Sequence, residues 1–249
     1  LMRRMVKEKL VKFDGKPLFP ERRAYVADYK LSPGESNLYE EVTHYVKEEF
    51  NRAKALEDGR RKGTVGFAMT VLQRRLASSP AAIYSSLCRR RDRLQLQLDE
   101  AIEKKQQVIT DDVQVETRAI PTFTDSNEPD TSYEDFYDDI DPDELDDIEE
   151  EIVDAATSAQ TIDELRKEIV ILGGLVTEAD SVRRSNCDSK WAKLREILDD
   201  HPMMKFPDGR RRKLVIFTEH KDTLYYLEEK IRTLTGRHES IVTITGGMD

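Results

Sequence analysis

The amino-acid sequence predicts a mainly α-helical fold: long antiparallel helices, followed at the C-terminus by a partial α/β unit of strand, helix and strand. Apolar residues recur at helical spacing through most of the 249 residues. Charged residues make up 36% of the chain, well above the roughly 25% of an ordinary globular domain, which favours many solvated helical faces. After Pro207, short continuous apolar runs typical of buried strands replace the helical spacing.

The first helix is expected from Ser32 to about Lys54. Serine can cap a helix, proline suits the first helical position, and Glu35 completes a capping box with Ser32. Apolar residues then follow at helical spacing, at Leu38, Val42, Tyr45, Val46 and Phe50. Upstream, the sequence predicts a turn over residues 14–17 and a short strand over residues 23–31.

A second helix is expected to end at Ser78-Ser79-Pro80, and a third to run from Ala81 to about Gln107. The third contains LQLQLDEAI (residues 94–102), which resembles the Mg²⁺-binding strand end of a nucleotide hydrolase. That chemistry needs a phosphate-binding GxxxxGK[ST] loop upstream, which the chain lacks. Since the same residues continue the helical apolar stripe, we favour the helix and expect no catalytic residue here.

An acidic segment, residues 119–165, contains 18 Asp or Glu and no Lys or Arg. Its first half predicts a flexible linker, and Leu145 to Ala156 could form an acidic helix. The segment is interpreted either as a tether that competes with nucleic acid for basic helices or, the favoured alternative, as a soluble spacer. Two more helices are expected beyond it, one from a capping box at Thr161 and one around Trp191.

The C-terminal part predicts one βαβ unit with a parallel crossover. Residues 214–217 (LVIF) and 241–244 (IVTI) read as strands, and apolar residues at helical spacing between them predict a helix ended by Gly236. One such unit is not a sheet, so its partner strands are expected beyond Asp249 or in another chain. The chain is therefore expected to be a piece of a longer protein.

Unmixed positive charge marks the region between residues 52 and 93, where eleven Lys or Arg stand against three acidic residues. A solvated helical face normally mixes signs, so this pattern favours phosphate contact over a solvated charged face. The candidates are Arg74, Arg75, Arg89, Arg90 and Arg93. Neighbours such as Arg89 and Arg90 lie about 100° apart around a helix, so not all of them can face one ligand.

Two blocks resemble bacterial Swi/Snf-like helicases of superfamily two. The segment GFAMTVLQRRLASSP (residues 66–80) is similar to a helix of those enzymes. Residues 213–227 and 244–248 resemble the opening of their second RecA-like lobe, around motif IV. Residues 1–4 and 14–23 resemble the segment just after the first lobe's last motif.

The resemblance implies a fragment of an ATP-dependent DNA helicase or translocase, in five parts. These are the tail of the first lobe (1–31), a basic helical insert (32–118), an acidic linker or insertion (119–160), helices leading to the second lobe (161–206) and the start of that lobe (207–249). The implied site residues are Gln73, Arg74, Arg75, Ser78 and Ser79 on the helix, and Phe217 and Thr218 at motif IV.

The resemblance places ATP and Mg²⁺ in the full-length parent, outside this chain, so no cofactor is expected in the fragment and it alone should not hydrolyse ATP. It implies as partners DNA, the remaining lobes and, from the relatives it points to, RNA polymerase or defence and restriction proteins. The alternative is a stand-alone helical nucleic-acid-binding or protein-interaction module without ATPase activity.

Composition bounds the remaining possibilities. Two cysteines and four histidines show no metal-ligand spacing, so no metal site is expected. No apolar run approaches the roughly 20 residues of a membrane span, and no signal peptide is expected. The chain is therefore expected to be cytoplasmic, without a membrane partner.

Overall fold

The computed structural model describes residues 10–15, 18, 24, 26–56, 59–108, 142–185, 187–200, 205, 208–210, 212–236, 239 and 241–245. It divides into two units, Leu1–Lys30 and Leu31–Asp249. In the first unit a turn covers residues 12–15 and overlaps the predicted turn at 14–17 only in part: Gly15 has a φ of 78° and its N–H donates to the Lys12 carbonyl over 3.0 Å, while residues 16 and 17 lie outside the described residues. The described residues of the predicted strand, 26–30 among them, are irregular.

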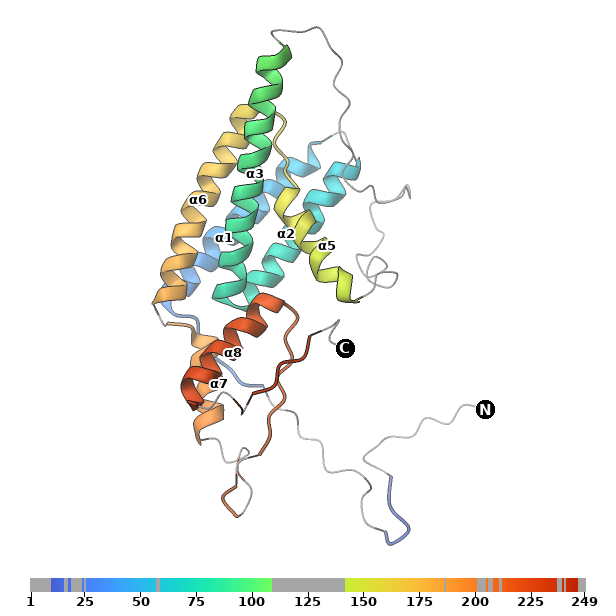
Figure 1. Ribbon diagram of the computed structural model, residues 1–249, viewed down its shortest axis with the longest axis vertical. Helices are drawn as coiled ribbons and strands as arrows, with labels where there is room; N and C mark the ends of the chain where they lie inside the picture. The colour runs from blue at the N-terminus through green and yellow to red at the C-terminus, as the bar shows by residue number, and fades with distance from the viewer. Residues whose placement is uncertain are drawn as a thin grey trace, which may run out of the picture. The chain divides into compact units, whose positions relative to one another are not determined.

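The second unit is mainly helical, as predicted (Figure 1). Its helices are α1 (Pro33–Lys54), α2 (Gly59–Ser78), α3 (Pro80–Val108), α5 (Pro142–Ala155), α6 (Ile162–Arg184), α7 (Ser189–Asp200) and α8 (Lys221–Thr235). Helices α3 and α6 lie side by side, α1 packs on α2 and α6, and α5 lies against α2 and α3. Helix α8 contacts α3.

The predicted helix starts are confirmed. Ser32 caps α1, its hydroxyl accepting from the Glu35 N–H over 3.3 Å while Glu35 accepts from the Ser32 N–H over 2.7 Å. Thr161 caps α6, its hydroxyl accepting from the Glu164 N–H over 3.2 Å, while the Glu164 carboxylate accepts from the Gln160 N–H over 2.7 Å. Each cap satisfies donors that a helix leaves unpaired in its first turn.

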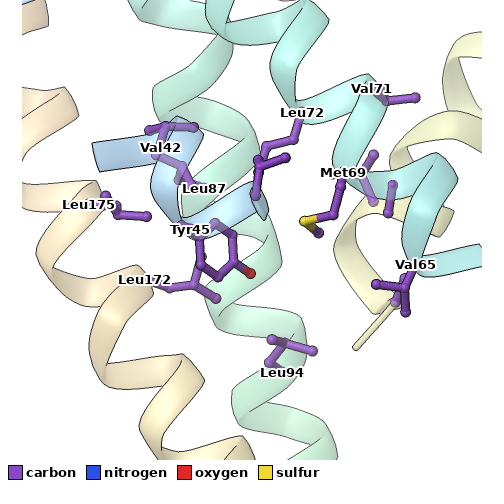
Figure 2. Packing of buried hydrophobic residues seen from close by; sticks show 14 of the residues in the cluster. Val42, Tyr45, Val65, Met69, Val71, Leu72, Leu87, Leu94, Leu172 and Leu175 are labelled. Atoms are coloured by element: carbon purple, nitrogen blue, oxygen red, sulfur yellow. The ribbon is translucent and has the colours of Figure 1, made fainter. Parts of the chain in front are cut away.

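The core lies among α1, α2, α3 and α6 (Figure 2), with Val42, Leu72, Leu87, Leu94 and Leu172 all fully buried. Helix α3 runs unbroken through residues 94–102, so the helical interpretation of LQLQLDEAI is confirmed. Asp99 is exposed and accepts a hydrogen bond from the Gln95 amide over 3.0 Å, as in an ordinary helix.

The acidic helix predicted in the second half of the acidic segment is present as α5. Its apolar face enters the core through Ile152 and Val153, and Ala156 follows them. The predicted linker over residues 119–141 lies outside the described residues. The boundary at 160 does not separate packing units, because α5 shares the core of α2, α3 and α6.

Of the predicted βαβ unit, the helix is present as α8, which ends at Gly236 with a φ of 63°. The two predicted strands are not: residues 214–217 and 241–244 are irregular. A strand forms only when a neighbour accepts and donates its backbone hydrogen bonds, and the described residues offer these segments none. Most of their apolar side chains are exposed, Phe217 at 92% and Val242 at 84%, whereas Ile216 and Ile241 are half-buried. No described helix is long and apolar enough to cross a membrane.

Candidate functional site

Arg90, one of the predicted phosphate contacts, is completely buried. Its guanidinium donates to the Tyr45 hydroxyl over 2.7 Å, to the Glu168 carboxylate over 2.8 Å, and to the Val153 carbonyl. Burial would lower the pKa of Arg90, but the hydrogen bonds and charges of Tyr45 and Glu168 raise it overall, so the guanidinium stays charged. This corrects the prediction for Arg90: its side chain joins α1, α3 and α6 from inside.

Arg75 is also buried, with 2% of its side chain exposed. From α2 it donates to the Ser86 hydroxyl over 2.9 Å and to the Glu150 carboxylate over 3.3 Å. Asp222, in the first turn of α8, lies 3.9 Å away. In this arrangement Arg75 has no surface to offer a phosphate, which corrects the prediction for this residue as well.

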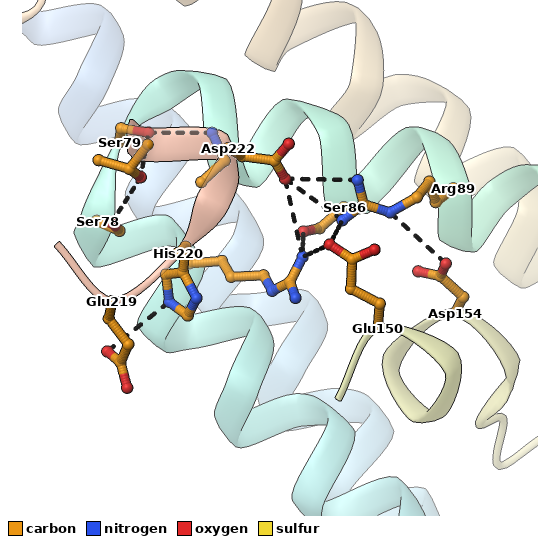
Figure 3. A network of polar contacts seen from close by, with 12 residues as sticks. Ser78, Ser79, Ser86, Arg89, Glu150, Asp154, Glu219, His220 and Asp222 are labelled. Carbon is orange, nitrogen blue, oxygen red and sulfur yellow. Dashed lines mark hydrogen bonds and ion pairs between the residues drawn. The ribbon is translucent and has the colours of Figure 1, made fainter. Parts of the chain in front are cut away.

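Arg89 forms the centre of a charged cluster (Figure 3) and shares its partners Glu150 and Asp222 with Arg75. Its guanidinium pairs with Glu150 over 3.0 Å, Asp222 over 3.4 Å and Asp154 over 3.6 Å. Arg74 pairs with Glu149 over 3.4 Å and with Glu219, just before α8. The acidic partners come from α5 and from the start of α8, so both elements neutralise the basic helices from within the chain.

Ser78 and Ser79, the two serines of the SSP turn, meet α8 directly. Their hydroxyls lie 2.7 and 2.9 Å from the hydroxyl of Thr223, which is buried. Ser79 also accepts from the Ala82 N–H over 3.1 Å and so caps the start of α3. The contact therefore places the first turn of α8 where α2 ends and α3 begins. We call the contacts of residues 74–89, 149–154 and 219–223 the junction.

Helix α7 extends the junction. Lys190 donates to the Ala77 carbonyl over 2.7 Å, at the last turn of α2, where a cation suits the helix dipole. Asp188 accepts from the Tyr226 hydroxyl over 2.7 Å and from the Trp191 N–H over 2.7 Å. Because Tyr226 is on α8, the two helices are tied to each other and to α2.

Two ionisable groups at the junction have shifted pKa values. Burial, together with Arg75 and Arg74 nearby, lowers the pKa of His220 to about 4, and neither ring nitrogen has a hydrogen-bond partner. Burial raises the pKa of Asp154 to about 6, although the charge of Arg89 opposes the shift.

The other predicted site residues lie elsewhere. Gln73 is exposed on α2 and Arg93 is exposed on α3, where the described residues supply no acidic partner for it. Phe217 is exposed and Thr218 is half-buried in the irregular segment before α8. The predicted set is thus divided between the core, the junction and open surface.

The junction also contains residues that the sequence did not single out, namely Glu150, Asp154, Asp222 and Thr223. Their contacts join segments that are far apart in the sequence and match in charge or polarity. Local sequence patterns therefore do not reveal them. The described residues hold no group of three or more His, Cys, Asp or Glu that could bind a metal ion.

Helix α5 does not behave as a removable cover of the basic helices. Besides its ion pairs it buries Ile152 and Val153, and each such side chain contributes about 1.5–3 kcal/mol. Non-specific nucleic-acid binding provides roughly 5–8 kcal/mol. Exposing both side chains to make room for nucleic acid would cancel a large part of that free energy. This argues against competition with nucleic acid for the described part of the acidic segment.

No family model, no curated protein and no solved structure matches the chain.

Proposed function

We propose that this chain is the inter-lobe helical region of a bacterial ATP-dependent DNA helicase or translocase, and that its task is mechanical coupling. The observation that carries the proposal is the junction. The segments on which the resemblance rests, 66–80 and 213–227, lie far apart in the sequence, yet Arg74, Ser78 and Ser79 contact Glu219 and Thr223. A fragment that joins a helical insert to the second lobe needs a contact at this place.

The coupling would run through α8. Its first turn is held by two ion-paired arginines and two serine hydroxyls, and its middle is held by Tyr226 on Asp188. A rotation of the second lobe that moved α8 would therefore pull on the ends of α2 and α3. Packed helices transmit such shifts because close-packed interfaces do not deform continuously.

The exposed apolar segments support a lobe that continues beyond the chain. Residues 214–217 and 241–244 flank α8 and expose Phe217, Val242 and Ile244. Paired with further strands they would become the predicted βαβ start of a RecA-like sheet. The alternative, a stand-alone nucleic-acid-binding or protein-interaction module, leaves these two segments without a role.

In this proposal ATP and Mg²⁺ are bound by residues outside the chain, and the partners are DNA and the remaining lobes. RNA polymerase or defence and restriction proteins, and a cytoplasmic location, belong to the same proposal. The first test is the coding frame on both sides of the segment. A phosphate-binding GKT loop and a DExH box upstream are expected, and a natural product that ends at Asp249 would contradict the proposal.

The second test uses the longer product. Asp222→Asn with Thr223→Val should weaken the junction and lower DNA-stimulated ATP hydrolysis several-fold, while hydrolysis without DNA stays unchanged. Equal stimulation in the variant and the wild type would show that the junction does not couple the lobes.

A further inference from the structure

A groove of about 420 Å³ runs between α1 and α2. Its polar and aromatic lining comes from Lys47, Phe50, Asn51 and Lys54 of α1, and from Thr70 and Gln73 of α2. The α1 residues follow the spacing i, i+3, i+4 and i+7, so they share one face of the helix. Of these residues, only Gln73 belongs to the predicted site.

The groove carries two lysines, Lys47 and Lys54, for which the described residues supply no ion-pair partner. No acidic residue is among those described as lining it. Lys47 is exposed, and the Lys54 ammonium lies 4.8 Å from the centroid of the Phe50 ring, a contact that holds the charge in place. Lys47 and Lys54 are two helical turns apart, about 10.5 Å along the axis.

Helix α1 carries opposite charges on its two grooves. A groove of similar size, about 430 Å³, lies between α1 and α6 and is lined by Glu41, His44 and Glu48. The residues that line the α1/α2 groove thus include two lysines and no carboxylate, whereas those that line the α1/α6 groove include two carboxylates and no lysine. Of the two grooves, the one between α1 and α2 therefore suits an anionic ligand.

We propose that the groove between α1 and α2 binds the phosphodiester backbone of a nucleic-acid strand. Lys47 and Lys54 would each neutralise one phosphate, and the amides of Asn51 and Gln73 would donate hydrogen bonds to phosphate oxygens. This rests on the proposed function and gives it a contact surface other than Arg74, Arg75, Arg89 and Arg90, which pair within the chain. Recognition by two lysines and two amides is weak and independent of base sequence.

Fluorescence anisotropy of the whole chain with a labelled 20-nucleotide single strand and a 20-base-pair duplex, from low to moderate salt, tests the proposal. The double variant Lys47→Gln, Lys54→Gln should lower the log–log salt slope by about 1.4 on the single strand and about 1.8 on the duplex. The matched control is Lys104→Gln, Lys167→Gln, which removes two exposed lysines from α3 and α6 and should leave the slope unchanged.

Gln73→Ala removes a neutral donor, so it should lower affinity roughly tenfold without a matching change in slope. Folding is checked for each variant by circular dichroism. Equal slopes for the groove variant and the control would overturn the proposal, and so would an absence of binding to nucleic acid at low salt. It would also be overturned if the groove variant lost binding to poly-glutamate to the same extent as binding to nucleic acid. The coding-frame test does not depend on any of these outcomes. Failure of the groove proposal can therefore be distinguished from failure of the helicase assignment.

Discussion

A buried arginine is held in this molecule by the groups that neutralise it. Arg90 and Glu168 are both 0% exposed, 2.8 Å apart, and share the Tyr45 hydroxyl, which itself donates to Glu168 over 2.9 Å. Taking two charges out of water costs several kcal/mol each, which only good geometry and further hydrogen bonds offset. The pair therefore fixes how α1, α3 and α6 pack more than it adds net stability.

Removing one partner should expose that cost. Arg90→Met leaves Glu168 buried without its cation and should destabilise the fold by about 3–5 kcal/mol, measured by urea denaturation. The double variant Arg90→Met, Glu168→Met removes both charges and should recover much of the loss. Arg93→Gln, one helical turn away and exposed, is the control and should change stability by no more than about 0.5 kcal/mol. A single variant as stable as the wild type would refute the buried-pair account.

The pKa of Asp154 gives a prediction with a defined pH window. Its folded pKa of about 6 lies above the ordinary value of 3.8, so the folded state holds the proton more tightly and stability falls as pH rises from about 4 to 6. His220 acts in the opposite direction, since its folded pKa of about 4 lies below 6.5 and stability rises as pH rises through that window.

Asp154→Asn should remove only the first of these effects. The variant should match the wild type near pH 4 and exceed it at pH 8 by on the order of 1–3 kcal/mol, measured as urea midpoints at both pH values. Asp163→Asn, whose carboxylate is 83% exposed, should show no such difference between the two pH values. A constant gain for Asp154→Asn at pH 4 and pH 8 would contradict the raised pKa.

At the scale of elements, the sequence predicted helices well and their polar contacts poorly. Capping boxes and apolar stripes located α1, α3 and α6 because both signals are local. Arg90 follows Leu87 by three residues and precedes Leu94 by four, a core position in the stripe. Arg75 holds the same kind of position after Leu72. Treating every arginine as surface charge hid this signal, whereas the pairing with Glu150 and Asp222 depends on tertiary structure that no local pattern contains.

The docking of α8 on the turn between α2 and α3 can be tested at one hydroxyl. Thr223→Val keeps the shape of the side chain but removes both contacts, with Ser78 and Ser79, and buried polar groups left unpaired cost about 1–3 kcal/mol. Hydrogen exchange of the α8 amides should accelerate roughly tenfold. Thr233→Val is a matched control, because Thr233 is exposed on the same helix and bonds only within it, to the Glu229 carbonyl. Equal exchange in both variants would show that the hydroxyl does not hold α8.

At the scale of the whole molecule, net charge misleads about where anions can bind. The chain carries −10 overall, and in its most basic stretch Arg74, Arg75 and Arg89 pair with α5 and the start of α8, while Arg90 pairs with Glu168 of α6. High charge density in the sequence therefore marks segments that pair with oppositely charged segments of the same chain. What stays available to a polyanion is the set of cations that the fold leaves unpaired on the surface, and only the three-dimensional arrangement shows which these are.

Removing the charge of Arg75, Arg89 or Arg93 should therefore affect either nucleic-acid binding or stability, depending on the residue. Arg93 is exposed without an acidic partner among the described residues, so Arg93→Gln should keep stability and lower the salt slope of duplex binding by up to about 0.9. Arg75 and Arg89 share Glu150 and Asp222. Replacing both by glutamine should leave the salt slope unchanged but lower the urea midpoint, because those carboxylates lose their cations at a half-buried site.

The two measurements separate the alternatives on one set of proteins. If Arg75 and Arg89 contacted phosphates, their double replacement would reduce the slope by about 1.8 and leave stability nearly unaltered. If they are structural, the loss appears in the urea midpoint alone, and binding per folded molecule is retained. Arg74 has a side chain that is 34% exposed and pairs with Glu149 and Glu219, so Arg74→Gln should behave as the structural pair does. A reduced slope for Arg74→Gln would show that the charge at this edge of the junction reaches bound nucleic acid.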